Sequence, residues 1–273
     1  MLRQYDHGAI VRVEAARTVL GRPLHHVYSF LIDGLLIDTG PPATAAAMAR
    51  WAASQRIHTV VVTHHHEDHS GGAPRLARTL TVPILAPPAT VSILAAFPRI
   101  PLYRRLVWGQ PGSVTVLPLP EVVETERYRF RVIPTPGHAA DHVALFEERE
   151  GWLVSGDLYI SPRAVYLRPV EDAWTILASL ERLRDLKPKL LLCSHAGLVA
   201  DATCALERKI AYWRGLAEKA RTLAGPGARP ESISRRLLGR EGAMTAISLG
   251  DFSKRNLIRS LLEDPGGPRR LGD

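Results

Sequence analysis

The sequence predicts an α/β fold, because strand-like runs alternate with helical ones along most of the chain. Short apolar runs such as 57–63 and 190–193 are typical of buried strands. Longer segments with apolar side chains at helical spacing, such as 43–53 and 171–186, stand between such runs. With 273 residues, 46% of them hydrophobic, the chain can bury one large core and a smaller appendage.

The N-terminal part begins with two predicted strands, over 27–32 and 35–37. A helix over 43–53 follows and leads to a strand over 57–63, which is rich in β-branched residues. A further helix is predicted over 73–79. This alternation of strands and helices is the order expected when a sheet is covered by helices.

The middle of the chain, residues 83–120, contains frequent prolines and has poor periodicity. Within it we expect 89–108 to be a helical insertion or lid beside a cleft rather than more sheet. A helix over 171–186 ends before Lys187-Pro188 and leads into the strand 190–193. The sequence contains no internal repeat and no low-complexity tract.

After residue 201 the pattern changes to a long amphipathic helix that ends near residue 223 and is closed by Gly-Pro-Gly at 225–227. Two shorter helices are predicted, over 232–238 and 253–262. This helical part could roof a cleft and select substrate, or serve only packing and dimerisation. A homodimer is therefore one of the assemblies the sequence leaves open.

The most informative segment is 63–72, Thr-His-His-His-Glu-Asp-His-Ser-Gly-Gly. Its spacing H-x-H-x-D-H brings His64, His66, Asp68 and His69 into six residues. Imidazole and carboxylate together suit zinc and similar first-row ions, whereas calcium and magnesium prefer oxygen ligands. Because neighbouring side chains of a strand point to opposite faces, we expect a loop wrapped around metal. A surface histidine cluster is the alternative interpretation.

Three further candidate ligands follow apolar strands downstream. His138 ends the run 130–138, Asp157 ends the run 152–157, and His195 ends the run 190–195. The end of a strand is where a sheet can aim polar groups into a shared cleft. Each is a weak signal alone, since His and Asp are common in turns. Together with the first cluster, they indicate a complete metal site.

These segments resemble the metallo-β-lactamase superfamily of metallo-hydrolases over roughly residues 8–200. The matching segments, in the family's order, are Leu36-Ile37-Asp38-Thr39-Gly40, Thr63 to His69, Thr135-Pro136-Gly137-His138, Ser155-Gly156-Asp157 and Ser194-His195-Ala196-Gly197. The resemblance implies a four-layer αββα sandwich. It also implies that His64, His66 and His138 bind one metal, Asp68, His69 and His195 bind a second, and Asp157 bridges the two.

The resemblance suggests two parts, a catalytic domain over 1–200 and a C-terminal helical extension over 201–273. In this plan the chain is more similar to the lactamase-B-2-like branch than to glyoxalase II. Asp38 is expected to hold the metal loop without contacting metal. His65 and Glu67 are interpreted as solvated or loop-fixing residues. Asp141 and His142 are interpreted as residues of the site wall or hydrogen-bonding partners, and no metal contact is expected for His7, His25, His26 and His58.

The implied chemistry is hydrolysis by a hydroxide held between two divalent ions, since such a pair lowers the pKa of water from near 16 to roughly 7. Asp68 would orient the nucleophile. Tyr159, or else Tyr166, could donate a hydrogen bond to the developing oxyanion. The two cysteines, Cys193 and Cys204, lie outside the ligand pattern. Zinc is the expected ion, with iron and manganese as alternatives.

Three functions are compatible with this site. The leading one is hydrolysis of a small ester, thioester or lactone. The second is cleavage of single-stranded RNA or another phosphodiester, and the third is a metal-dependent oxidoreductase or sulfur dioxygenase, a class that usually loosens the second metal site. The net charge of +8 raises RNA as a partner, but the arginines are scattered rather than clustered. The start of the chain lacks a secretory pattern and no apolar stretch could cross a bilayer, so a cytoplasmic location is expected.

Overall fold

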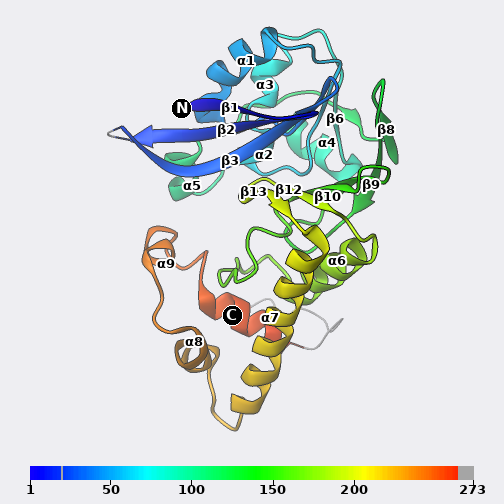
Figure 1. Ribbon diagram of the computed structural model, residues 1–273. Coiled ribbons are helices and arrows are strands. Elements are labelled where there is room, and N and C mark those ends of the chain that lie inside the picture. The colour runs from blue at the N-terminus through cyan, green and yellow to red at the C-terminus, as the bar shows by residue number, and fades with distance from the viewer. Residues whose placement is uncertain (20, 264–273) are drawn as a thin grey trace.

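The computed structural model describes residues 1–19 and 21–263 and contains two β-sheets with helices on their outer faces (Figure 1). The last ten residues of the predicted C-terminal extension, 264–273, lie outside the described residues. Among the residues that are described, none of the helices is both long and apolar enough to span a membrane.

The first sheet has seven strands in sequential order. They are β1 (Leu2–His7), β2 (Ile10–Val19), β3 (Arg22–Ile32), β4 (Leu35–Ile37), β5 (Thr59–Val61), β6 (Ile84–Ala86) and β7 (Leu117–Pro118). Strands β1 to β4 pair antiparallel and β4 to β7 pair parallel. Strands β4 and β5 lie in the middle of this sheet, which explains why they are almost wholly apolar.

The second sheet has six strands in the order β13-β12-β11-β10-β9-β8. They are β8 (Val122–Glu124), β9 (Arg129–Pro134), β10 (Val143–Glu147), β11 (Trp152–Gly156), β12 (Leu190–Cys193) and β13 (Gly197–Ala200). Only β11 and β12 pair parallel, because the helix between them returns the chain to the same end of the sheet. All five residues of β10 are buried.

The helices of the sandwich lie before, between and after these strands. They are a short 3-10 turn η1 (Pro42–Thr44), α1 (Ala45–Ala53), α2 (Glu67–Ser70), α3 (Ala73–Leu76), α4 (Pro88–Ala95), α5 (Leu102–Val107) and α6 (Ala173–Asp185). Helix α6 is capped by Asp172, whose carboxylate accepts a hydrogen bond from Thr175 N at 2.7 Å. Proline stands in the first turn of α3 and α4, where its missing N–H costs no hydrogen bond.

The sandwich predicted from the resemblance is confirmed. One hydrophobic core lies between the sheets, where Phe30 and Ile37 of the first sheet meet Phe130, Leu145 and Val154 of the second. A separate cluster joins the first sheet to α1, α3 and α4, and another joins the second sheet to α6. Helix, sheet, sheet and helix thus form four layers (Figure 1).

The C-terminal part consists of α7 (Ala202–Leu223), α8 (Pro230–Leu238), α9 (Ala243–Ile247) and α10 (Lys254–Leu262), which extend away from the sandwich (Figure 1). The buried face of α7, including Leu206 and Trp213, belongs to the same hydrophobic cluster as α6. Leu257 and Leu261 of α10 join that cluster too. The division at residue 201 stays a prediction, since packing is continuous across it.

Several strands are absent from the sequence-based prediction. The hairpin β1–β2 was not predicted, and β6 and β7 lie inside the proline-rich region 83–120. Strands of two or three residues carry too few positions to show alternation. The expected helical insertion 89–108 forms two short helices, α4 and α5. The segment 63–72, here called the ligand loop, contains one helical turn, α2. The extension contains a short helix, α9, that the sequence does not predict.

Replacing Trp213 with alanine is expected to lower the free energy of unfolding by about 3–5 kcal/mol. Its side chain is 2% exposed, and its indole Nε1 donates a hydrogen bond to Ala164 O at 2.8 Å. The variant would leave both a cavity and an unpaired carbonyl. Chemical denaturation measures the change. Leu249→Ala is the control, because Leu249 is 93% exposed, and a similar loss in both variants would contradict the prediction.

Candidate metal centre

The ligand loop follows β5 and bends sharply into α2 and α3. Thr39 N donates to His69 O at 2.7 Å, which ties the loop to the end of β4. A Cβ at Gly72 would lie 2.2 Å from Thr39 O, and one at Gly71 would lie 2.2 Å from Glu67 O. Only glycine fits at these two positions. The Gly-Gly pair therefore allows the loop to pack closely against the first sheet.

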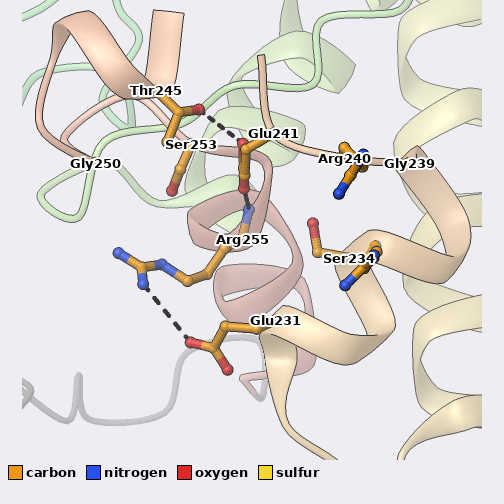
Figure 2. A pocket seen from close by; sticks show the side chains of 10 residues that line it. Glu231, Ser234, Gly239, Arg240, Glu241, Thr245, Gly250, Ser253 and Arg255 are labelled. Atoms are coloured by element: carbon orange, nitrogen blue, oxygen red, sulfur yellow. Dashed lines mark hydrogen bonds and ion pairs between the residues drawn. The ribbon is translucent and has the colours of Figure 1, made fainter. Parts of the chain in front are cut away.

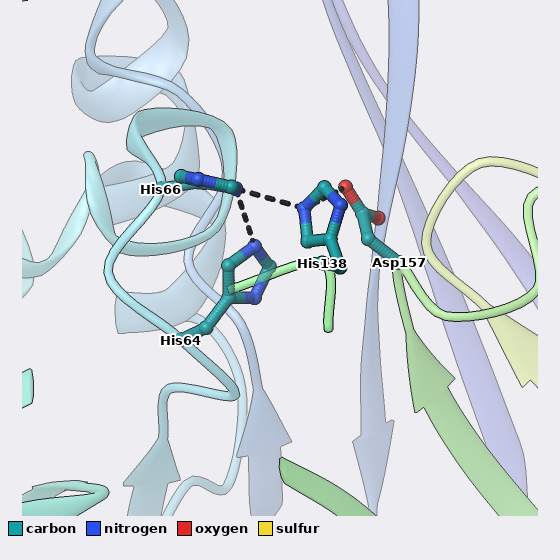
Figure 3. Close-up of side chains that lie close together, drawn as sticks. All are labelled: His64, His66, His138 and Asp157. Atoms are coloured by element: carbon teal, nitrogen blue, oxygen red, sulfur yellow. Dashed lines mark hydrogen bonds and ion pairs between the residues drawn. The ribbon is translucent and has the colours of Figure 1, made fainter. Parts of the chain in front are cut away.

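Four side chains converge at the first group, which Figure 3 shows: His64, His66, His138 and Asp157. His66 Nδ1 lies 2.8 Å from His64 Nε2 and 2.9 Å from His138 Nε2. His138 Nε2 lies 3.4 Å from Asp157 Oδ2. All four residues are buried.

A second group forms on the other oxygen of the same aspartate and contains Asp68, His69, Asp157 and His195. Asp157 Oδ1 lies 3.2 Å from His69 Nε2 and 3.3 Å from His195 Nε2. His195 Nε2 lies 3.4 Å from Asp68 Oδ2. All seven residues predicted as ligands thus come together, and Asp157 is shared. Their individual roles as metal ligands stay a prediction.

The donor set fits divalent cations. Within each group the candidate ligand atoms lie within 4.8 Å of one another. Within the described residues, His69 Nε2 and Asp157 Oδ1 are buried and, although they lie 3.2 Å apart, neither forms a hydrogen bond. Such atoms are costly unless something pairs with them. Histidine nitrogens with carboxylate oxygens are ligands typical of zinc and related ions, so a cation in each group would satisfy these atoms.

The histidine pKa shifts differ between the first and the second group of candidate ligands. Burial, together with the charge of neighbouring histidines, holds the pKa of His64 well below its usual value, and burial with Arg168 does the same for His66. Burial also acts to lower the pKa of His69 and His195, but the Asp157 carboxylate and its acidic neighbours raise both well above the usual value. The second group thus concentrates negative charge, which a bound cation would neutralise.

Asp38 supports the second group, as the sequence predicts. It is 1% exposed and has a φ of 61° in the left-handed region. Its carboxylate accepts hydrogen bonds from Thr63 N at 2.8 Å and from Thr63 Oγ1, and lies 2.7 Å from His69 Nδ1. This contact places the proton of His69 on Nδ1 and leaves Nε2 free to bind metal.

Asp38→Asn is expected to weaken metal binding about 10- to 100-fold, because an amide cannot accept from both Thr63 and His69 as the carboxylate does. Metal competition titration with a chromophoric chelator measures the affinity. The fold should persist, which circular dichroism checks. Asp33→Asn is the matched control, since Asp33 also has a positive φ but pairs with Arg127 away from the site. Unchanged affinity in Asp38→Asn would contradict the assigned role.

Residues between the candidate ligands fix the loop. The distance from His65 Nδ1 to Asp141 Oδ1 is 2.9 Å, and the Asp141 carboxylate also accepts a hydrogen bond from Thr90 Oγ1. Burial acts to raise the pKa of Asp141, but its hydrogen bonds and the charge of His65 lower it to about 2. Glu67 is fully buried in a two-bond pair with Arg104 at 2.7 and 2.5 Å. The interpretation of Glu67 as solvated is therefore wrong, whereas its loop-fixing role is supported.

His142 is a hydrogen-bonding partner of the site, as predicted. Its Nε2 accepts from Asp157 N at 3.1 Å, so its Nδ1 donates to Thr135 Oγ1 at 2.7 Å. Burial and the neighbouring His138 lower the pKa of His142 to about 3. A neutral ring is what this arrangement requires, because a protonated ring could not accept from Asp157.

Sequence reasoning missed two buried residues after β11, Arg168 and Glu171. Glu171 Oε1 lies 2.6 Å from His138 Nδ1, which orients the ring of that histidine. Arg168 Nη2 lies 2.8 Å from His66 Nε2. Both stand in an irregular segment between Asp157 and α6, and no spacing rule links them to the histidines. Their only signal in the sequence is an Arg-x-x-Glu pair ahead of a helix cap.

Other residues considered at the site have different positions. Tyr159 is 4% exposed and belongs to the hydrophobic cluster with α6 and α7 rather than to the cleft lining. The structure therefore does not bring it to the ligands, whereas the alternative, Tyr166, lines the cleft. His25 lines the cleft as well but stands outside both groups, and so do the other three histidines for which no metal contact is expected, His7, His26 and His58.

A cleft of about 420 Å³ opens beside the candidate ligands, between the sandwich and the C-terminal helices. Apolar side chains make up much of its lining: Val107, Trp108, Leu158, Ile160, Val165, Leu167, Ile176, Trp213, Met244, Ile247 and Phe252. The insertion helix α5 meets the extension here, because the Tyr103 hydroxyl hydrogen-bonds the carboxylate of Asp251. The predicted lid and the extension together thus enclose the cleft.

A second hollow lies in the extension itself, between α8 and α10 (Figure 2). It is lined by Arg235, Arg240 and Arg255 together with Glu231 and Glu241, and none of the candidate metal ligands reaches it. Arg255 pairs with Glu231 at 3.8 Å, and its backbone N donates to Glu241. This hollow is separate from the metal centre.

Comparisons with known proteins agree with this geometry. The chain is 29% identical over 175 residues to a hydroxyacylglutathione hydrolase of Nitrosomonas eutropha, covering 63% of this chain and 60% of that protein. It is 28% identical over 185 residues to a β-lactamase-like protein 2 homolog of Drosophila melanogaster, covering 63% and 58%. The chain thus spans about three fifths of the length of these curated relatives.

The whole fold has counterparts among solved structures. A β-lactamase domain protein from Burkholderia ambifaria superposes with a TM-score of 0.71 at 22% identity, covering 95% of this chain and 88% of that one. The family model of the metallo-beta-lactamase superfamily matches residues 22–195, more than half of the 273 residues and the span that holds every candidate ligand. The chain therefore belongs to the metallo-β-lactamase superfamily.

Proposed function

We propose that the protein is a metal-dependent hydrolase that cleaves a small ester, thioester or lactone with two divalent ions, zinc being the expected metal. The observation that carries the proposal is the pair of four-residue groups that share Asp157 and border an apolar cleft. When bound, such a pair of ions activates water at neutral pH and polarises the acceptor oxygen of the substrate.

The chain's own residues would contribute orientation and proton transfer. Asp68 lines the cleft and is buried, so its carboxylate can take the proton of the attacking water and return it to the departing thiolate or alkoxide. Asp38 and Glu171 accept from the Nδ1 atoms of His69 and His138. They thereby hold both rings in the tautomer whose Nε2 carries no hydrogen and can bind metal. The cleft walls would exclude other water from the reacting carbonyl.

Among these substrates a thioester is the leading candidate. The relative from Nitrosomonas eutropha is named for hydrolysis of a hydroxyacylglutathione, which is a thioester. The apolar lining provided by Trp108, Trp213 and Ile247 suits an acyl chain better than a polar polymer. The cleft volume of about 420 Å³ is in the range of small-molecule sites.

A substrate panel tests the proposal. Protein loaded with zinc, and separately with manganese or iron, is assayed with a lactone, a thioester, an aryl ester and bis(p-nitrophenyl) phosphate. We expect turnover of the thioester or ester. Turnover of the phosphodiester alone, with RNA binding that weakens steeply as salt rises, would instead support the nuclease alternative. No turnover of any substrate by protein with a full metal load would overturn the hydrolase proposal.

A further inference from the structure

The cleft contains a buried guanidinium with donors to spare. Arg168 is 5% exposed and lines the cleft, and in the part of the chain that the structure describes its Nε has no hydrogen-bond partner. The nearest carboxylate, Glu171, is already engaged: its Oε1 is 2.6 Å from His138 Nδ1 and its Oε2 accepts from Arg168 N at 2.7 Å. Arg168 Nε is 3.5 Å from Glu171 Oε1 and makes no hydrogen bond to it.

The guanidinium also lies over the ring of Phe252, 5.7 Å from its centroid, and its hydrogen bond to His66 conflicts with the metal centre. A guanidinium only donates, so the 2.8 Å contact of Arg168 Nη2 requires His66 Nε2 to accept. A neutral His66 would then carry its hydrogen on Nδ1. Yet Nδ1 is the atom that faces His64 and His138 in the first group, and a metal-binding nitrogen must be free of hydrogen. A neutral His66 cannot serve both partners.

Of the other cations that line the cleft, Arg163 is exposed to solvent, whereas Arg104 and Lys209 are paired. Arg104 donates from Nε and Nη2 to the two carboxylate oxygens of Glu67. Lys209 Nζ donates to the carbonyls of Leu158 and Tyr159 at 2.9 and 2.6 Å. With metal bound, Arg168 would thus have free donors on both Nε and Nη2, on the cleft side of the ligands. The Glu171 carboxylate, 3.5 Å from Nε, faces this buried charge, but the free donors still need acceptor oxygens, which a second anion would supply.

We propose that Arg168 determines specificity by binding a carboxylate of the substrate, so that the preferred thioester or ester is an anionic one. The inference rests on the proposed hydrolase function. Nε and one terminal nitrogen of a guanidinium form a fork that matches the two oxygens of a carboxylate. Because one imidazole ring, that of His66, separates Arg168 from the centre of the first group, the carboxylate would lie only a short chain away from the scissile carbonyl.

The test compares thioesters that carry either a carboxylate or an uncharged group at the same position. The N-acetylcysteamine thioester of succinate is compared with that of isocaproate, in which an isopropyl group replaces the carboxylate. For a carboxylate on the thiol side, the butyryl thioester of mercaptopropionate is compared with that of N-acetylcysteamine. We expect kcat/KM to favour the anionic member of at least one pair by roughly 30-fold or more, with the uncatalysed rate subtracted.

Two variants and a control assign the preference to Arg168. In Arg168→Met the ratio between the paired substrates should fall to near one, and in Arg168→Lys, which keeps the charge without the fork, it should fall by about tenfold. The control is Arg240→Met, an exposed arginine of the hollow in Figure 2, in which the ratio should not change. Thermal melting checks that each variant folds.

A binding measurement provides a readout besides turnover. Calorimetric titration of succinate into the zinc-loaded protein should show binding that weakens at least about tenfold in Arg168→Met and stays unchanged in Arg240→Met. If thioesters are hydrolysed but neither pair shows a preference, the inference fails while the hydrolase function stands. A preference that survives in Arg168→Met would also overturn it. If the loaded protein hydrolyses no thioester, ester or lactone, the proposed function itself fails.

Discussion

Asp157→Ala is expected to lower kcat/KM by at least about 10³-fold and to reduce the bound metal to at most one ion per chain. Asp157 is the residue common to both groups, with Oδ2 facing His138 and Oδ1 facing His69 and His195. Its loss therefore removes a ligand from each group at once. Elemental analysis of protein purified without a histidine tag measures the metal content, alongside steady-state kinetics.

The matched control is Asp185→Ala, at the end of α6, where the side chain is 66% exposed and pairs with Arg184. This variant should keep wild-type metal content and activity. Asp68→Ala and His138→Ala should each abolish hydrolysis while the protein stays folded. If Asp157→Ala retained both ions and full turnover, the shared-ligand arrangement would be refuted.

Removal of metal is expected to abolish hydrolysis and to lower the melting temperature by about 10 °C, since a ligand present at a thousand times its Kd stabilises by about 4 kcal/mol. Without cations, the buried carboxylates of Asp68 and Asp157 face each other across the second group and are paired with histidines in place of metal. Dialysis against a chelator, followed by differential scanning calorimetry, measures the shift.

Adding back zinc should restore both activity and melting temperature, and parallel additions of manganese and iron rank the metals. In Asp157→Ala the metal-dependent shift should be much smaller than in the wild type. A chelated protein that elemental analysis shows to be free of metal, yet melts and turns over like the untreated protein, would contradict the assignment of these residues as a metal centre.

The sandwich and the set of seven candidate ligands were implied by the resemblance to a known family, and local patterns in the sequence supported both. Each ligand follows an apolar strand, and the Gly71-Gly72 pair marks the tight turn after the loop. By contrast, β6 and β7 are too short to show a period, and their membership in the first sheet depends on pairing with strands far along the chain.

What the sequence by itself determined was the kind of chemistry, since the spacing of His64, His66, Asp68 and His69 already specifies nitrogen and oxygen ligands for transition-type ions. Only the tertiary structure decided which other side chains reach that site. In the fold, Tyr159 lies in the hydrophobic core and Glu67 is buried against Arg104. Arg168 contacts His66, which is 102 positions away along the chain. Contacts at such separation depend on how layers pack, and side-chain packing has no period that can be read along a chain.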